Sequence, residues 1–268
     1  MTINYSSQMS KVQPKKKLGQ HFLNDIGIAR KIAASLTGEG YSSVLEIGPG
    51  MGILTGCLLE RGFSDLRVIE IDNESVQYLK THLPEMDKII TGDFLSMDID
   101  FTFSDKMAII GNFPYNISTQ IFFKVLKHRE KVVEIAGMLQ KEVAERICSG
   151  PGSKKYGILS VLLQAYYKAE YLFTVSENVF SPPPKVKSGV IRLIRNDVKS
   201  LECDENLFFR VVKACFNQRR KMLRNSVRAA FDLKRDDYFE FGLRPEQLSV
   251  DQFVQLTRWI DVNRVKSE

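Results

Sequence analysis

The run Asn112-Phe113-Pro114-Tyr115 places an amide, a fixed backbone and an aromatic ring directly after the apolar residues 107–110. Proline lacks a backbone donor and fixes φ, so the carbonyl of Phe113 keeps one direction. That carbonyl and the Asn112 side-chain oxygen can hold the two hydrogens of a ring-conjugated amine, while Tyr115 stacks on the ring. The run therefore suits the amino group of adenine. The alternative is a capped turn before a helix, which leaves the choice of Asn112 unexplained.

A glycine-rich turn, GPGMG, occupies residues 48–52 and follows Glu46 closely. Glycines allow positive φ and let a ligand approach the backbone. Nicotinamide and flavin folds use a similar turn, but their fingerprint needs a small residue where this chain has Ile53, and Pro49 would stand where a pyrophosphate must approach. The carboxylate of Glu46 favours a cationic ligand over an anionic one.

Two further acids, Glu70 and Asp93, point to one kind of ligand. Glu70 stands 70 − 50 = 20 residues after Gly50, the separation at which an acid can accept from both hydroxyls of a ribose. The alternative interpretation is that Glu70 is an exposed carboxylate at a strand end with no ligand. Asp93 can accept from an adenine amino group beside Phe94. Together these residues describe an adenosine that carries a cation and no phosphate, which is S-adenosylmethionine.

The elements that must position these residues alternate along the chain. We expect strands at residues 43–47, 66–71, 87–91, 106–110, 134–140, 169–175 and 189–195, and helices at 52–61, 74–82, 119–127, 141–148 and 158–166. Such alternation predicts an α/β fold, a Rossmann-like parallel sheet with helices on both faces. Ligands of these sheets bind at the carboxyl ends of the strands, and Asn112 lies just past one of them.

The β pattern stops near residue 196. Helical spacing returns at residues 207–216, 221–231 and 250–262. We therefore expect two domains, a methyltransferase-type domain over residues 1–195 and a small all-α domain over residues 196–268.

The formal net charge is +6, from 38 basic and 32 acidic residues, but the basic residues gather at two places. The first cluster is Lys11, Lys15, Lys16 and Lys17. The second is Lys213, Arg219, Arg220, Lys221, Arg224, Arg228, Lys234 and Arg235, opposed within the run only by Asp232. One such run is often a solvated helix face, but two in one chain favour a polyanionic partner.

Other functions have little support. The four cysteines and three histidines show no metal-ligand spacing, so we expect no metal site. The first seventeen residues lack the apolar centre of a secretory signal, and no segment reaches the ~18 apolar residues of a membrane span. We expect a cytoplasmic protein.

Chemistry at an adenine amine needs positioning more than a base, because the methylated amine sheds its proton to water. The base must also leave its stack, and Phe180, which precedes three prolines at 182–184, is a candidate to stack on its free face. The alternative for Phe180 is hydrophobic packing.

The chain resembles the small-subunit ribosomal RNA adenine dimethyltransferases, whose loss confers kasugamycin resistance. The matching segments are KKKLGQHFLND at 15–25, VLEIGPGMGILT at 44–55, VIEID at 68–72, GD at 92–93, GNFPYNIS at 111–118, QKEVAERI at 140–147 and FSPPPKVKSGVIRL at 180–193. The family commonly has Leu where this chain has Phe113, a change we expect to be tolerated.

The resemblance implies dimethylation of two adjacent adenosines near the 3′ end of small-subunit ribosomal RNA, on assembling subunits. It implies that His21 and Leu23 close over S-adenosylmethionine, and the cofactor site becomes His21, Leu23, Gly48, Gly50, Glu70, Ile71, Asp93, Phe94 and Asn112. The predicted catalytic set is Asn112, Pro114, Tyr115 and Phe180. RNA contacts are predicted at Lys15, Lys16, Lys17, Arg219, Arg220, Lys221 and Arg224.

Three rival functions stay open. A resistance-type methylase of large-subunit RNA would share the cofactor, although KVKSGVIRL and LGQHFL argue against it. An assembly factor would keep the basic surface and lose little without Asn112. A nicotinamide oxidoreductase comes last. We expect a monomer, because no long apolar stripe is left without a core to cover.

Overall fold

The computed structural model describes residues 12–265. The strands are β1 Phe22–Leu23, β2 Ser43–Ile47, β3 Asp65–Glu70, β4 Ile89–Thr91, β5 Met107–Asn112, β6 Val132–Gln140, β7 Tyr167–Val175, β8 Phe180–Ser181 and β9 Ser188–Arg195. The α-helices are α1 Ile26–Ala33, α2 Ile53–Glu60, α3 Asn73–His82, α4 Ile99–Thr102, α5 Ser118–Lys127, α6 Lys141–Cys148, α7 Ile158–Gln164, α8 Glu205–Asn217, α9 Leu223–Arg228 and α10 Val250–Asn263. No helix of the described part is long and apolar enough to cross a membrane.

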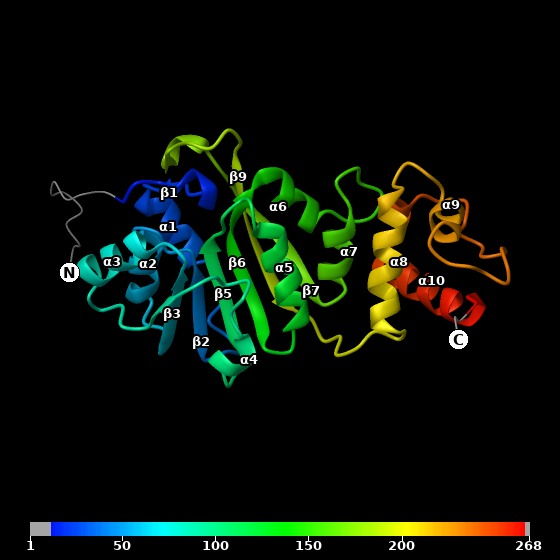
Figure 1. Cartoon of the computed structure of the whole chain (residues 1–268), viewed down its shortest axis with the longest axis horizontal. Coiled ribbons are helices and arrows are strands. Elements are labelled where there is room, and N and C mark those ends of the chain that lie inside the picture. Colours follow the sequence, from blue (N-terminus) through cyan, green and yellow to red (C-terminus); the bar gives the residue numbers. More distant parts are fainter. Residues whose placement is uncertain (1–11, 266–268) are drawn as a thin grey trace.

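One seven-stranded sheet forms the centre of the molecule, with the order β4-β3-β2-β5-β6-β9-β7 (Figure 1). The first five of these strands are parallel, as predicted. The expectation of a wholly parallel sheet is wrong for the last two pairs, because β9 runs antiparallel to both β6 and β7. The link from β7 to β9 contains no crossover α-helix, so the two strands run in opposite directions.

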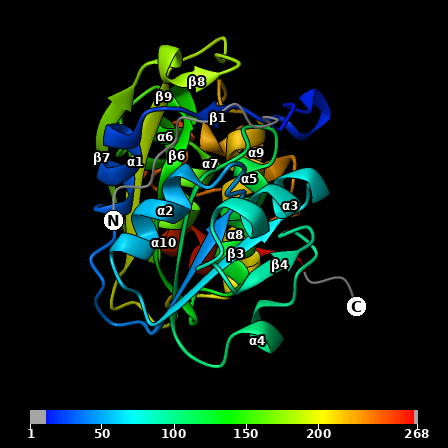
Figure 2. The ribbon, with the colours of Figure 1, turned by 90° about the vertical axis from the view of Figure 1, so that its left-hand side faces the viewer.

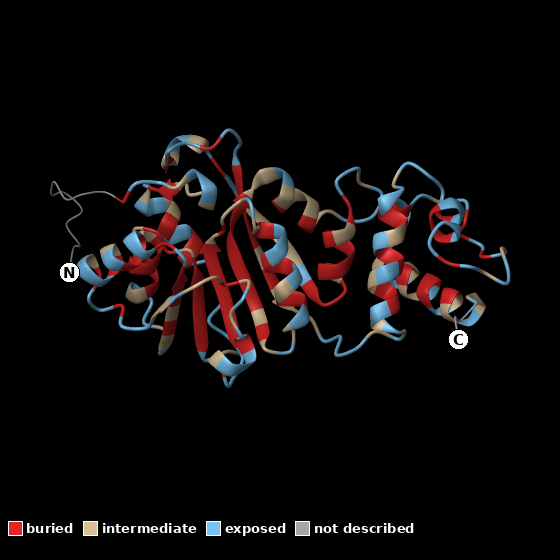
Figure 3. Ribbon diagram, in the orientation of Figure 1, coloured by how far each residue is buried: buried red, intermediate tan, exposed pale blue. Residues whose placement is uncertain are grey.

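Helices cover both faces of the sheet, as alternate residues of β5 demonstrate. Met107 and Ile109 join a buried cluster with residues of α5, α6 and α7. Ala108 and Ile110 join a second cluster with residues of α1, α2 and α3. The central strands are accordingly buried along their length (Figure 3). A strand that is apolar on both sides needs such cover, which explains its unbroken apolar sequence.

The helices after residue 195 extend from one end of the sheet (Figure 1). Helices α8, α9 and α10 match the three predicted ones, although α9 is shorter than the expected 221–231. Phe208 of α8 shares a buried cluster with Leu162 of α7, so the apolar core continues across residue 195. The division of the chain into two domains at that residue stays a prediction.

A two-stranded sheet that the sequence did not predict joins the N-terminal segment to the proline-rich segment. Phe22 of β1 pairs with Ser181 of β8, and Leu23 pairs with Phe180, in antiparallel register. Figure 2 shows β1 and β8 together at the top of the sheet. The proline-rich segment thus holds only a short strand outside the main sheet, where a missing backbone donor is tolerated.

Candidate active site

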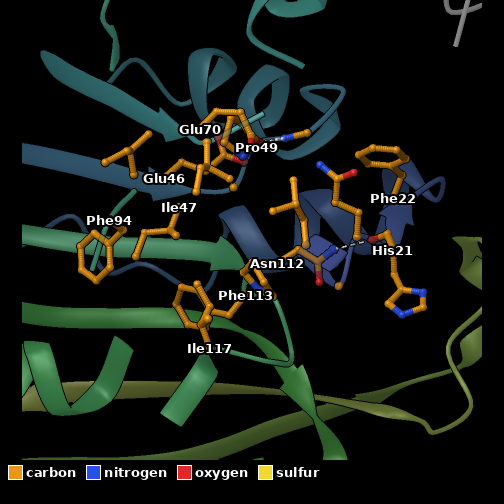
Figure 4. Close-up of a pocket in the computed structure, with 18 of the residues that line it drawn as sticks. His21, Phe22, Glu46, Ile47, Pro49, Glu70, Phe94, Asn112, Phe113 and Ile117 are labelled. Atoms are coloured by element: carbon orange, nitrogen blue, oxygen red, sulfur yellow. Dashed lines mark hydrogen bonds between the residues drawn. The ribbon is translucent and has the colours of Figure 1, made fainter. Parts of the chain in front are cut away.

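A pocket lies at the carboxyl ends of β2, β3 and β5 (Figure 4). Its lining includes every predicted cofactor residue, His21, Leu23, Gly48, Gly50, Glu70, Ile71, Asp93, Phe94 and Asn112, and also Pro114 and Tyr115. It includes as well Leu18, Gln20, Met51 and Ile117, which carry no chemical signal in the sequence. The fold therefore brings the predicted residues of the strand ends into one place.

The glycine turn follows β2 in a conformation that other residues rarely adopt. Gly48 has φ 67° and Gly50 has φ 55°, both in the left-handed region. A Cβ on Gly50 would lie 2.8 Å from the ring of Phe22. Glycine at this position therefore lets the N-terminal segment pack directly on the turn.

Glu70 joins the glycine turn to the end of β3. Its Oε2 accepts the backbone N–H of Gly50 at 3.1 Å, and its Oε1 accepts that of Asp72 at 2.9 Å. The side chain is buried; burial raises its pKa, and the two backbone donors oppose that rise. Each carboxylate oxygen has a second lone pair, so both can still accept from ribose hydroxyls.

Glu46 is the more deeply buried acid of the pocket. Its Oε2 accepts from the Thr55 hydroxyl at 2.7 Å, and burial raises its pKa to about 8. Burial therefore favours the protonated form of this carboxyl. A cation in the pocket would favour its ionised form.

The raised pKa of Glu46 predicts a pH dependence of stability. The carboxyl has a higher pKa in the folded chain than the ordinary 4.5, so its stabilising contribution is fully present below that value and is lost as pH rises through about 8. One such group changes the free energy of unfolding by at most about 1.4 kcal/mol per pH unit. Glu46→Gln keeps the acceptor for Thr55, and we expect it to unfold with a weaker pH dependence between about pH 5 and about pH 8. Urea titrations of both proteins across this range measure the difference.

Glu85→Gln, at an exposed acid, is the control for that measurement and should follow the wild type. Parallel curves for the wild type and Glu46→Gln would contradict the assignment of the proton to Glu46.

Asp93 and Phe94 form a tight turn after β4. Asp93 Oδ1 accepts the backbone N–H of Leu95 at 2.9 Å, and its carbonyl accepts those of Ser96 and Met97, each at 3.1 Å. Within residues 12–265 no protein donor occupies Asp93 Oδ2. That oxygen is therefore available to an amino group in the pocket, beside the buried ring of Phe94.

The orientation of the Asn112 amide is fixed by a contact from the N-terminal segment. Asn112 Nδ2 donates to the carbonyl oxygen of His21 at 2.9 Å (Figure 4). Since two oxygens would repel each other at this distance, the nitrogen must face His21. The side-chain oxygen of Asn112 is left as an acceptor at the pocket.

Tyr115 is held at both ends of its side chain. Its hydroxyl and the Ser188 hydroxyl share a hydrogen bond of 2.6 Å, and burial raises its pKa. Its ring centroid lies 5.6 Å from that of His21, with 31° between the planes. His21 is fixed in turn, because its Nδ1 lies 2.8 Å from the carbonyl oxygen of Pro182. Tyr115 and His21 therefore lie side by side next to Asn112, each with a polar contact to the 182–188 segment.

Phe180 does not line this pocket. It lies in β8, where it is 4% exposed and belongs to a buried cluster with Leu23. Hydrophobic packing, the alternative considered for this residue, describes its position here. Its stacking on a target base stays a prediction and requires the ring to leave this cluster.

The N-terminal basic cluster divides into two kinds of residue. Lys15 pairs with Asp72 and, at 3.0 Å, with Glu74, and Gln20 Nε2 donates to Asp72 at 3.3 Å. In this structure Lys15 thus attaches the N-terminal segment to the start of α3. Lys16 and Lys17 are exposed. Lys11 lies outside the described residues.

The second basic cluster also has internal partners. Arg219 donates to the carbonyl oxygen of Lys154, and Arg224 lies 3.6 Å from Asp236. Asp236 follows the predicted basic run, so the run is more balanced than its sequence indicates. Arg220 and Lys221 are exposed and form no ion pair with any residue in 12–265.

The acidic side chains that line the pocket fit S-adenosylmethionine. Glu46, Glu70 and Asp93 line it, and none of its described lining residues is a lysine or an arginine. Phosphate groups would need cationic partners, whereas a sulfonium benefits from nearby carboxylates. The pocket therefore suits an adenosine that carries a positive charge.

Comparisons with known proteins give the relatives of this chain. The family model for ribosomal RNA adenine dimethylase matches residues 11–261. The chain is 57% identical to ribosomal RNA small subunit methyltransferase A of Flavobacterium johnsoniae, over 97% of this chain and 100% of that protein. It is 58% identical to the protein of the same name from Parabacteroides distasonis, over 93% of this chain and 94% of that one.

Two solved structures share the fold. A dimethyladenosine transferase from Plasmodium falciparum superposes with a TM-score of 0.75 at 24% identity, covering 91% of this chain and 99% of that one. The 23S rRNA methyltransferase ErmE superposes with a TM-score of 0.65 at 24% identity, covering 90% and 99%. The predicted fold class is confirmed by these two structures.

Proposed function

The chain belongs to the ribosomal RNA adenine dimethylase family and is an S-adenosylmethionine-dependent methyltransferase, and from this premise we propose that it dimethylates two adjacent adenosines near the 3′ end of small-subunit ribosomal RNA during subunit assembly. The relatives named small subunit methyltransferase A support that choice of substrate. The observation that carries the chemistry is the Asn112 amide, whose oxygen is left as an acceptor at the pocket.

The residues of the Asn112 loop act on the adenine amine. When bound, S-adenosylmethionine would supply the methyl group of its sulfonium, and the rest of the cofactor would leave as a neutral thioether. Asn112 Oδ1 and the Phe113 carbonyl would accept the two amine hydrogens, which favours a pyramidal nitrogen with its lone pair directed at the methyl carbon. The residues of the Asn112 loop would thus hold the amine nitrogen toward the methyl group that the bound cofactor would supply.

No side chain is needed as a base for this reaction. The methylated nitrogen carries a positive charge and releases one proton to water, after which the amine can be methylated again. Tyr115 would stack on the base and limit its motion. Its hydroxyl is engaged with Ser188, so we assign Tyr115 no proton transfer. Catalysis then rests on positioning.

Methyl transfer to isolated subunits tests this function. Radiolabelled S-adenosylmethionine is incubated with small subunits that lack the modification, and with large subunits. We expect about four methyls per small subunit, two on each of two adenosines. Label on large-subunit RNA alone would favour a resistance-type methylase instead. Tight binding without transfer would leave an assembly factor.

The exposed part of the second basic cluster is our candidate for RNA contact. We expect the double variant Arg220→Glu and Lys221→Glu to bind small subunits more weakly. The salt dependence of binding should also become shallower, by about 0.7 in log–log slope for each lost single-strand phosphate contact. Filter binding at several salt concentrations measures both effects.

Lys199→Glu is the matched control, because Lys199 is exposed and precedes the other end of α8. Its affinity and salt slope should stay near the wild-type values. An unchanged affinity in the double variant would remove this surface from the proposal. Lys16 and Lys17 are proposed to contact RNA near the cofactor entrance, and we propose a cytoplasmic monomer.

A further inference from the structure

Lys124 of α5 reaches back to the turn that follows β4. Its Nζ donates to the carbonyl oxygen of Leu95 at 3.0 Å and also to that of Met97. The same ammonium lies 5.2 Å from the centroid of the Phe94 ring. One charged group therefore holds three successive parts of this turn from outside the pocket.

This turn is held by apolar packing as well, because Phe94 belongs to a buried cluster that Leu95 and Met97 contact. It connects β4, which ends at Thr91, to α4, which begins at Ile99. Its amides are satisfied within the turn by Asp93, as described above, whereas two of its carbonyls are satisfied by Lys124. Hydrogen bonds from a charged donor are stronger than those between neutral groups. Burial lowers the pKa of Lys124, while the nearby charge of Asp93 opposes that effect.

The helix that carries Lys124 also supports the catalytic loop. α5 begins at Ser118, and the Ser118 hydroxyl donates to the Tyr115 carbonyl at 3.3 Å. One side of the pocket, the Asp93 turn, is thus attached to the same helix as the other side, the Asn112 loop. We propose that Lys124 is a positioning residue, which holds the adenine-binding turn of the cofactor site at a set position relative to the loop that holds the target base.

This inference rests on the proposed function, because it takes the 93–97 turn as the adenine-binding part of the cofactor site. Lys127 supplies a matched control. It lies one turn later on α5, is exposed, and has no hydrogen bond to the turn. Lys127→Met and Lys124→Met therefore make the same chemical change on one helix.

The first test uses the cofactor-free protein. The amides of Leu95, Ser96 and Met97 are hydrogen-bonded within the turn. Lys124→Met should raise their hydrogen-exchange rates about tenfold relative to wild type, while Lys127→Met leaves them unchanged. Wild-type exchange at these amides in Lys124→Met would overturn the inference.

The second test measures cofactor affinity by titration calorimetry with S-adenosylhomocysteine. Lys124→Met should bind about tenfold more weakly, with a similar loss for methylthioadenosine, because the missing contact supports the adenine end. Lys124→Arg should recover most of the affinity. In methyl transfer the KM for S-adenosylmethionine should rise and kcat should fall, because the turn and the Asn112 loop are no longer held in one relative position.

The remaining outcomes distinguish a failure of the Lys124 inference from a failure of the proposed function. If Lys124→Arg binds as weakly as Lys124→Met and both lose thermal stability equally, Lys124 is only a structural residue and the inference is wrong. If Lys124→Met binds within twofold of wild type, it is also wrong. If the wild type itself binds no S-adenosylhomocysteine, the proposed function fails, and the inference fails with it.

Discussion

Replacing Asn112 by alanine should lower the rate of methyl transfer to small subunits by roughly 10²–10³-fold, the loss seen when one preorganised hydrogen-bonding group is removed from an active site. The variant loses the acceptor at the pocket and the hydrogen bond from Nδ2 to the His21 carbonyl. Single-turnover transfer from labelled S-adenosylmethionine measures the rate directly.

The comparison with other variants makes this result specific. Asn178→Ala, at an exposed asparagine on the segment before β8, should transfer methyl groups at the wild-type rate. Asn112→Asp keeps an acceptor oxygen at the pocket but sets its second oxygen against the His21 carbonyl, so we expect it to lose activity as well. Subunit affinity should change little in Asn112→Ala, because the basic residues proposed to contact RNA phosphates are unaltered. Wild-type transfer by Asn112→Ala would contradict the positioning mechanism.

Replacing Glu70 by alanine should weaken the binding of S-adenosylhomocysteine about a hundredfold, which is about 2.7 kcal/mol. The variant loses the proposed acceptors for two ribose hydroxyls, and charge-assisted hydrogen bonds contribute about 1.5–3 kcal/mol each. It also leaves the backbone N–H groups of Gly50 and Asp72 without their acceptor, so the glycine turn loses its connection to β3. Titration calorimetry gives the affinity.

The size of the effect should depend on the charge at position 70. Glu70→Gln keeps one acceptor oxygen, and we expect a loss of about tenfold. Glu85 is an exposed acid outside the pocket, and Glu85→Gln should bind S-adenosylhomocysteine as the wild type does. Unchanged affinity in Glu70→Ala would show that the ribose is bound elsewhere.

The shared location of Glu70, Asp93 and Asn112 could be predicted from the sequence. Each lies at or just after the end of a predicted strand, and the carboxyl ends of parallel strands meet at one edge of a sheet. The alternation of strands and helices along the chain predicted the helices on both faces of the sheet. These inferences need only local patterns and one general rule of α/β folds.

The contacts that close the pocket could not be predicted in this way. Asn112 is oriented by the carbonyl of His21, 91 residues earlier, and no pattern near either residue records that contact. Phe180, framed by prolines, resembles an exposed aromatic, but the pairing of β1 with β8 buries it. Lys15 looks like part of a basic cluster until the fold places Asp72 beside it. Each depends on segments that only the tertiary structure brings together.

The direction of β9 could not be predicted from the sequence, for a related reason. Residues 189–195 show a strand pattern that is the same whether the strand runs parallel or antiparallel. Only its place between β6 and β7, and the connection that leads to it, decide the direction.

That place of β9 has a consequence for the nascent chain. Within the described residues β7 pairs only with β9, so when β6 and β7 emerge from a translating ribosome neither the far edge of β6 nor any edge of β7 has a partner. Unpaired strand edges are sites of aggregation. Strands β7 and β9 can therefore join the sheet only once residues 188–195 have been synthesised. In a chain truncated before residue 188, β6 would be an open edge of the sheet and β7 would have no partner strand. Such a chain would depend on chaperones to stay monomeric.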